Sequence, residues 1–304
     1  MSAAVDFRIR WGMVIDIDKC TGCGVCLSAC QKENNIPPGQ DPADRFRSLN
    51  WLFIYDLSKA PGGQPEAAFL PRPCMQCGKP SCVSVCPVIA TDKNEEGGIV
   101  SQIYPRCFGC RYCMASCPYH ARVFGWYDPK WTPEAKELIT PHTSCRPRGV
   151  VEKCTFCHHR FMYAKDKARV AGEDPGHLAE DAYIPACVEA CPTGAMHFGD
   201  LNNPEHAVYK LKHDPNAFRL LERLGTDPQV YYISTREWVR RLGDNYLDGE
   251  ALNAPTHRYG AVGHGGGHAA AGAAHAAPAH GEPAHGEPAH GEASEGGQSG
   301  HGKE

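Results

Sequence analysis

The segment Cys20-Thr21-Gly22-Cys23-Gly24-Val25-Cys26-Leu27-Ser28-Ala29-Cys30 carries four cysteines with the spacing C-x2-C-x2-C-x3-C. Three more quartets follow: the second reads C-x2-C-x4-C-x3-C, the third repeats the first, and a 29-residue insertion splits the fourth. Their members are Cys74, Cys77, Cys82 and Cys86, then Cys107, Cys110, Cys113 and Cys117, then Cys154, Cys157, Cys187 and Cys191. Sixteen of the 17 cysteines belong to this pattern, and three quartets end in Cys-Pro.

This spacing fits the geometry of an iron–sulfur cube. Three cysteines two residues apart can wrap one tight loop, so that their sulfurs reach three corners of one cluster. The fourth is expected at the start of a helix, pointing away, and in two-cluster ferredoxins it binds the neighbouring cluster. Small residues such as Gly22, Gly24, Gly78 and Gly109 allow close approach of the backbone to cluster sulfur.

Three other uses of cysteine fit less well. A zinc site typically takes two C-x2-C pairs and needs neither a third ligand in the same loop nor a trailing Cys-Pro. A disulfide framework is typical of small secreted domains, whereas this chain has 304 residues and no recognisable signal peptide. A thioredoxin-like dithiol needs a single C-x-x-C.

The gaps between quartets predict how they pair. These gaps are 43, 20 and 36 residues, and only the middle one is short enough for one compact module. We therefore expect an inner module at about 70–130 and an outer module formed by about 10–50 plus 150–200. Exchange of the fourth ligand then gives four clusters: Cys20, Cys23, Cys26 and Cys191; Cys154, Cys157, Cys187 and Cys30; Cys74, Cys77, Cys82 and Cys117; and Cys107, Cys110, Cys113 and Cys86. Tandem pairing of the first and second quartets is the alternative.

The remaining sequence predicts a loop-rich α+β body of two nested ferredoxin-like modules over residues 1–250. Alternating and β-branched residues predict strands at 13–18, 99–104, 121–127, 195–199 and 229–233. Residues 217–224 read as a helix capped by Gly225. Residues 251–304 are rich in Gly, Ala and His and repeat Ala-His-Gly-Glu-Pro, so we expect a disordered tail that serves as a linker or partner-binding segment, with weak metal binding as the alternative.

Composition excludes several classes of protein. No apolar run reaches the roughly 18 residues of a membrane span, so we expect no transmembrane segment. The net charge of −4 argues against a nucleic-acid-binding protein. The N-terminus has neither an apolar signal core nor paired arginines, which fits a cytoplasmic protein or one exported with a partner that carries the signal.

The sequence resembles the iron–sulfur subunits of molybdopterin-type membrane oxidoreductases, such as dimethyl sulfoxide, polysulfide and nitrate reductases. It is most similar to that of the menaquinone reductase complex (Qrc) of sulfate-reducing bacteria. The stretches that carry the closer resemblance are RPCMQC at 72–77, EGGIVSQIYPRC at 96–107 and VEKCTFCHHR at 151–160.

The resemblance implies a non-catalytic electron-transfer subunit. Its implied partners are a large molybdopterin-family subunit, a multi-span quinone-binding membrane subunit of the polysulfide reductase type and, in the Qrc version, a multihaem cytochrome c. It further implies menaquinone reduction at the periplasmic face of the inner membrane, with the cytoplasmic face as the alternative. A subunit of a formate dehydrogenase, a hydrogenase or a dimethyl sulfoxide or polysulfide reductase-type complex is the alternative function.

Some relatives of this kind replace the second cysteine of the third quartet and hold a three-iron cluster there. Cys110 is present in this chain, so four [4Fe–4S] clusters are expected, with [3Fe–4S] at one site as the alternative. The resemblance also makes the third-quartet cluster the candidate for the quinone end.

Nearby cations are expected to tune the cluster potentials. The candidates are Arg72, Lys79, Arg106, Arg111 and Lys153, and the alternative is that each is an ordinary surface charge. Cys145 is the one cysteine outside the quartets, and we expect a spare buried thiol.

Overall fold

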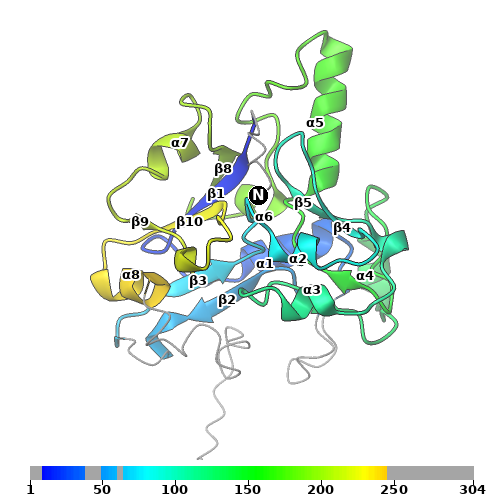
Figure 1. Ribbon diagram of the computed structural model, residues 1–304, viewed down its shortest axis with the longest axis horizontal. Coiled ribbons are helices and arrows are strands. Elements are labelled where there is room, and N and C mark those ends of the chain that lie inside the picture. Colours follow the sequence, from blue (N-terminus) through cyan, green and yellow to red (C-terminus); the bar gives the residue numbers. More distant parts are fainter. Residues whose placement is uncertain (1–8, 38–48, 60–63, 245–304) are drawn as a thin grey trace, which may run out of the picture. The chain divides into compact units, whose positions relative to one another are not determined.

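The computed structural model describes residues 9–37, 49–59 and 64–244 (Figure 1). The predicted tail at 251–304 and the predicted end of the body near residue 250 lie outside the described residues. Among the helices that are described, none is both long and apolar enough to cross a membrane.

A four-stranded sheet with the order β8-β1-β10-β9 contains the first described strand in its interior. β1 (Trp11–Asp16) is antiparallel to β8 (Met196–Asp200) and parallel to β10 (Val230–Ile233). β9 (Ala217–Phe218) closes the edge. The first five residues of β1 are all buried, because this strand is flanked on both sides by partners and covered on both faces.

Three two-stranded sheets complete the strand structure of the described residues. The first pairs β2 (Phe53–Asp56) with β3 (Phe69–Arg72). The second pairs β4 (Thr91–Lys93) with β5 (Val100–Gln102). The third pairs β6 (Val123–Phe124) with β7 (Val151–Glu152). All three pairs are antiparallel.

Four helices carry the third cysteine of a quartet. They are α1 (Val25–Glu33), α2 (Ser81–Ser84), α3 (Tyr112–Ala115) and α6 (Ala186–Glu189). α1 packs against α6, and α2 packs against α3. The helices of the first and fourth quartets are therefore neighbours, as are those of the second and third.

The other helices lie outside the cysteine loops. α5 (His158–Ala171) is the longest of the described helices, and Figure 1 shows it extending away from the sheets. It ends at Gly172, whose φ of 76° is a left-handed cap. The remaining helices are α4 (Pro133–Glu137), α7 (Ala207–Leu211) and α8 (Glu237–Asp244), with single 3-10 turns at Leu57–Lys59, Tyr104–Arg106 and Glu222–Leu224.

The α+β fold predicted from the sequence is confirmed, and all five predicted strands are present with shifted or shorter bounds. The helix predicted at 217–224 is wrong. Phe218 and Leu220 alternate inward as strand residues, β9 pairs with β10, and Leu221 adopts a positive φ of 51°. Sheet pairing therefore overrides the local helix propensity of this segment.

The expected position of the fourth cysteine is also wrong. Each helix begins just before the third cysteine, and the fourth lies four residues later: Cys30 within α1, and Cys86, Cys117 and Cys191 just after α2, α3 and α6. Each short helix thus separates two cysteines by about one turn.

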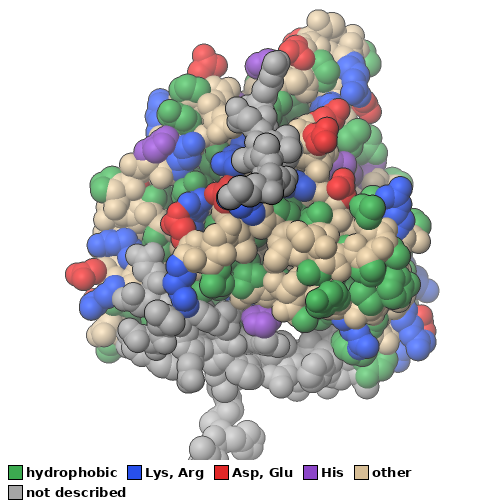
Figure 2. Space-filling model, in the orientation of Figure 1, with side chains coloured by type: hydrophobic (Ala, Val, Ile, Leu, Met, Phe, Trp, Pro, Cys, Tyr) green, Lys and Arg blue, Asp and Glu red, His purple; other side chains and the backbone are tan. Residues whose placement is uncertain are grey.

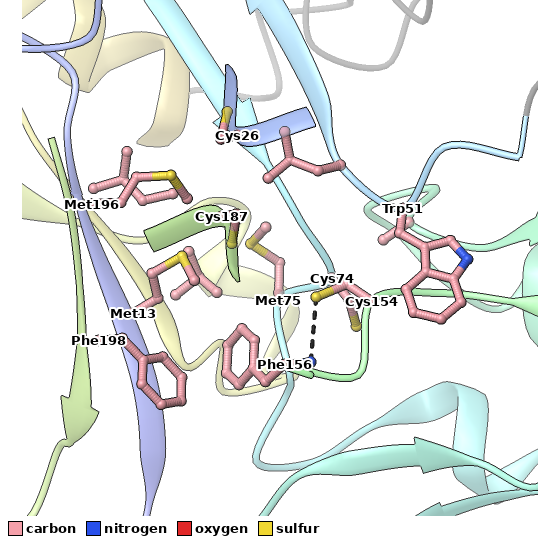
Figure 3. Packing of buried hydrophobic residues seen from close by; sticks show 14 of the residues in the cluster. Met13, Cys26, Trp51, Cys74, Met75, Cys154, Phe156, Cys187, Met196 and Phe198 are labelled. Carbon is pink, nitrogen blue, oxygen red and sulfur yellow. Dashed lines mark hydrogen bonds between the residues drawn. The ribbon is translucent and has the colours of Figure 1, made fainter. Parts of the chain in front are cut away.

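Cysteine side chains form part of the hydrophobic core. The largest buried cluster contains Cys26, Cys30, Cys74, Cys117, Cys154 and Cys187 together with Trp11, Met13, Met75 and Phe198. Figure 3 shows thioethers, aromatic rings and thiols packed together at its centre. The ring of Trp11 stacks on Phe198 with centroids 5.5 Å apart. Because the body buries so many thiols, what they bind is central to its stability.

Candidate metal centre

The structure brings the sixteen cysteines of the quartets into four groups. Group 1 is Cys20, Cys23, Cys26 and Cys191, which line one small cavity. Group 2 is Cys30, Cys154, Cys157 and Cys187: after burial, the charges of the other three raise the pKa of Cys187, and those of Cys154 and Cys157 raise that of Cys30. Group 3 is Cys74, Cys77, Cys82 and Cys117: after burial, the charges of neighbouring members raise the pKa of Cys77 and that of Cys117. Group 4 is Cys86, Cys107, Cys110 and Cys113, which line a second small cavity.

The composition of the groups follows the nested pattern. Groups 1 and 2 each combine cysteines of the first and fourth quartets, and groups 3 and 4 each combine cysteines of the second and third. In every group three members come from one quartet and the fourth from the partner quartet, as expected for exchange of the fourth ligand. This grouping is the one that nested modules predict.

The four groups follow one another in space. Burial raises the pKa of Cys187 in group 2, and the thiolate charge of Cys26 in group 1 adds to the effect. Burial and then Cys74 of group 3 raise the pKa of Cys154 in group 2 to about 12, and Figure 3 shows these two sulfurs side by side. Cys82 of group 3 likewise adds to the raised pKa of Cys113 in group 4, after burial. The order is therefore group 1, group 2, group 3, group 4.

Solvent reaches the two ends of this series more readily than its middle. All four cysteines of group 2 are buried, as are three of the four in group 3. In contrast, Cys23 of group 1 and Cys110 of group 4 are exposed. The series thus has two accessible ends and an insulated centre.

The cysteine loops share one backbone feature. The residue before the second cysteine has a positive φ in all four loops: 71° at Gly22, 47° at Gln76, 81° at Gly109 and 53° at Phe156. Gln76 and Phe156 adopt this left-handed conformation despite their side chains, which is a strain typical of functional sites. The conformation turns backbone N–H groups inward, and Phe156 N donates to Cys154 Sγ at 3.4 Å.

Further N–H groups are directed at the sulfurs. Ala90 N donates to Cys86 Sγ at 3.1 Å, and Val151 N lies 3.5 Å from Cys107 Sγ. The buried amide of Asn34 lies 3.7 Å from the sulfur of Cys30 and 3.9 Å from that of Cys157, both in group 2. Such bonds stabilise negative charge on sulfur and tune the potential of a bound cluster.

The thiols need a cation to be held as thiolates. Burial, followed by the charges of neighbouring cysteines, raises the pKa of Cys26 to about 12, and burial raises the pKa of Cys117 to about 11. Such thiols would stay protonated at neutral pH unless a metal replaced their protons, and a coordinated thiol is deprotonated outright. All 17 cysteines are free thiols, so the disulfide alternative fails.

The donor set therefore fits an iron–sulfur cluster in each group. Four sulfurs, inward N–H groups and a shielding apolar shell are the features that such clusters require. In the described residues, no three or more Cys, His, Asp or Glu side chains are arranged to hold a single metal ion.

The five predicted cations fall into two classes. Arg72 and Lys153 are buried, whereas Lys79, Arg106 and Arg111 are exposed. Lys153 donates from Nζ to the carbonyl oxygens of Val100 and Cys154, so its charge is held beside group 2.

Sequence reasoning missed two buried residues at the site, Asn34 and Arg122. Their only signal is position, because each lies a few residues after the fourth cysteine of a quartet. Arg122 is 4% exposed and lies beside Cys82 and Cys113. Cys145, which we expected to be buried, is exposed and belongs to none of the groups.

Comparison with known proteins agrees with this chemistry. A family model described as "4Fe-4S dicluster domain" matches residues 65–132, which contain the second and third quartets, and another with the same description matches residues 19–90. The iron–sulfur cluster-binding subunit of menaquinone reductase from Nitratidesulfovibrio vulgaris is 68% identical over 253 residues, which cover 83% of this chain and 99% of that protein.

More distant relatives cover most of the same length. The iron–sulfur subunit 1 of an Hdr-like menaquinol oxidoreductase from Archaeoglobus fulgidus is 38% identical, over 73% of this chain and 82% of that protein. The B subunit of polysulfide reductase from Wolinella succinogenes is 33% identical, over 75% and 95%. This protein therefore belongs to the family of iron–sulfur electron-transfer subunits of menaquinone reductase and related reductase complexes.

Proposed function

We propose that this chain relays electrons through four clusters in series, between a donor at group 1 and a quinone-reactive membrane subunit at group 4. The observation that carries the proposal is the linear order of the four thiol groups, exposed at both ends and buried between them. A protein that used its clusters only for stability would have no need of two accessible ends.

Each group would hold one [4Fe–4S] cluster on its four cysteines, and Cys110 supplies the ligand whose loss would leave a three-iron cluster. A cluster so held supplies one-electron transfer without making or breaking a bond to substrate. The inner module would cover about 70–130 and the outer module about 10–50 plus 150–200. The protein's own part is to place the sulfurs, exclude water from groups 2 and 3, and direct N–H groups and cations at them.

The proposed partners are a large molybdopterin-family subunit or a multihaem cytochrome c as donor, and a multi-span membrane subunit of the polysulfide reductase type as acceptor. The complex would reduce menaquinone at the periplasmic face of the inner membrane, where this chain would be peripheral. What supports this is the similarity to subunits named for menaquinone reductase, menaquinol oxidoreductase and polysulfide reductase.

The surface around group 4 is suited to an apolar partner. We name the apolar patch as the exposed side chains of Val88, Ile89, Phe108, Tyr112, Trp126 and Tyr127. Ile89, Phe108 and Tyr112 are each exposed by about 60% (62%, 63% and 60%), and Figure 2 shows apolar side chains gathered over the region of α2 and α3. Contiguous exposed apolar residues mark docking sites, so this end is the one we assign to the membrane subunit.

Charged substitutions in the apolar patch are expected to release the chain from its membrane partner. Phe108→Glu and Tyr112→Glu replace exposed aromatic anchors, and losing such an anchor typically costs about 2 kcal/mol or more of binding energy. The measurement is the fraction of this subunit that co-purifies with the membrane subunit. Val170→Glu, at a position on α5 that is 91% exposed, is the matched control and should co-purify normally. Equal retention of all three variants would contradict the assignment.

Removing one ligand at the exposed end tests the relay itself. Cys110→Ser is expected to convert or abolish the group 4 cluster alone, leaving the EPR signals of the other three. Menaquinone reduction by the assembled complex should fall to background, because electrons have no other exit. Cys145→Ser removes the cysteine outside the groups and should leave both signals and rate unchanged. Full menaquinone reduction after selective loss of the group 4 signal would refute the proposed path.

A further inference from the structure

Arg122 is a buried cation placed between two thiol groups. It lies next to β6, five residues after Cys117, and only 4% of its surface is exposed. Its guanidinium lies within electrostatic range of Cys82 and Cys74 in group 3 and of Cys113 in group 4. Cys82 and Cys113 are also neighbours across the boundary between these two groups, because the charge of Cys82 adds to the raised pKa of Cys113 after burial.

One edge of the guanidinium is fixed by the hairpin of β4 and β5. Nη1 of Arg122 donates to Thr91 Oγ1 at 3.1 Å and to Gln102 Oε1 at 3.2 Å. Thr91 and Gln102 face each other directly across the hairpin, and the Thr91 hydroxyl also donates to Gln102 at 2.8 Å. Both residues are buried, so this clamp positions one particular side chain.

At the other edge, Nε and Nη2 are buried and receive no oxygen or nitrogen acceptor in the described part of the chain. The groups beside the guanidinium are the sulfurs of Cys82 and Cys113. No ion pair links Arg122 to a carboxylate among the described residues either. A buried cation without a counter-charge is strongly disfavoured. The neighbouring sulfurs are what the structure offers as the counter-charge.

We propose that Arg122 is a shared counter-ion of the clusters at groups 3 and 4 and that it raises the reduction potential of both. The inference rests on the proposed function, because it needs those two clusters to be held by their cysteines. Each one-electron reduction adds one negative charge to a cluster. A fixed cation beside it stabilises the reduced form more than the oxidised form.

Burial makes this effect large. Charges interact far more strongly in the protein interior than in water. A guanidinium stays protonated throughout the pH range in which proteins fold, so Arg122 keeps its charge in this buried position. Arg111, which follows Cys110 directly, is exposed and rests over the rings of Phe124 and Trp126, where water and salt screen its charge.

The consequence is a gradient along the series. A cation shared by groups 3 and 4 favours electrons at the end that bears the apolar patch. It also reduces the repulsion between two electrons held on neighbouring clusters. Arg122 is a positioning residue in this sense, since it acts on the potentials without contacting any substrate.

A redox titration of the cluster-loaded protein, followed by EPR, tests the inference. In Arg122→Gln, the ratio of oxidised to reduced cluster at groups 3 and 4 should rise about tenfold or more when the solution potential is held fixed. That change corresponds to a fall in reduction potential of about 59 mV for a one-electron couple. Groups 1 and 2 should keep their potentials and serve as an internal reference. Arg122→Lys should recover part of the shift. Arg111→Gln, the exposed control, should shift the potential at group 4 far less.

A second variant covers the case in which Arg122→Gln does not assemble. Gln102→Glu keeps the shape and places a carboxylate at the Nη1 edge, so it should lower the same two potentials while Arg122 remains. Iron analysis separates the two proposals, because wild-type protein without iron would contradict the cluster assignment itself. Full iron with unmoved potentials in Gln102→Glu, and in Arg122→Gln where it assembles, would overturn the role of Arg122 alone.

Discussion

Removal of iron and sulfide is expected to abolish the cooperative unfolding transition of this protein. The main buried cluster contains six thiols, and group 2 has all four of its cysteines buried. Without metal these thiols would surround polar or empty space, and the loops would keep the strained conformations of Gln76 and Phe156 with nothing to hold them. In such proteins the free energy of metal binding is folding free energy.

The measurement is anaerobic thermal unfolding followed by near-ultraviolet circular dichroism, before and after reconstitution. The reconstituted protein should contain about 16 iron atoms, four for each group, and unfold in one transition. Cys145→Ser should load the same amount of iron, since that thiol belongs to no group. A protein that unfolds cooperatively without iron, or one loaded with zinc in native cells, would contradict the cluster assignment.

The prediction of sixteen cysteine ligands rests on a local constraint that cluster ligation imposes on the spacing of the cysteines. A loop that reaches three corners of a cube fixes the interval between its cysteines, and the fourfold recurrence leaves few other interpretations. The predicted pairing of quartets rests on a related reason: the segment of 20 residues between Cys86 and Cys107 is short enough for one hairpin, which the structure shows as β4 and β5. Both inferences depend on chain length and geometry rather than on side-chain packing.

The residues that were missed depend on contacts far apart in the sequence. Arg122 is clamped by Thr91 and Gln102, 31 and 20 positions earlier, so no local pattern identifies it. Asn34 reaches the sulfur of Cys157, 123 positions away. The helix predicted at 217–224 failed likewise, since only the pairing of Ala217 and Phe218 with β10 shows that the segment forms a sheet edge. Of the five cations chosen by proximity in sequence, three are exposed, because sequence neighbours of a cysteine can still point to solvent.

The buried pair Arg146 and Glu152 carries the other large expected effect. Both side chains are almost completely buried, at 1% and 0% exposure, and Nη1 of Arg146 lies 3.8 Å from Oε2 of Glu152. The same oxygen accepts a hydrogen bond of 3.1 Å from Trp51 Nε1. The guanidinium also lies over the rings of Trp51 and Tyr104, 5.1 Å and 4.8 Å from their centres.

Above neutral pH, Arg146→Met is expected to destabilise the cluster-loaded protein by about 3–5 kcal/mol, because it leaves the Glu152 carboxylate buried without its cation. For a body of this size that is a fall in Tm of roughly 10 °C. Burial already raises the pKa of Glu152 to about 7 with Arg146 in place, so the loss should shrink at lower pH, where Glu152 takes up a proton.

Methionine retains much of the apolar contact with Trp51 and Tyr104. The loss should therefore arise from the charge and from the hydrogen bonds that Nη2 of Arg146 donates to Thr143 and Ser144. The measurement is the thermal midpoint under anaerobic conditions, with iron content checked in each variant.

The double variant Arg146→Met with Glu152→Gln separates charge from packing. Glutamine keeps an oxygen that can accept from Trp51 Nε1 but carries no charge, so the part of the lost stability that comes from the unpaired carboxylate should return, as it does when both partners of a buried pair are replaced. If the double variant were no more stable than Arg146→Met, the cost would lie in the lost packing and hydrogen bonds of Arg146 rather than in an uncompensated carboxylate. If Arg146→Met itself cost less than about 1 kcal/mol, the pair would be no stronger than one on the surface.

The pair joins the end of β7, which leads directly into Cys154, to the ring of Trp51 that packs in the same core as group 2. A full effect would therefore mean that this buried charge pair helps to fix the loop that presents Cys154 and Cys157 to their cluster.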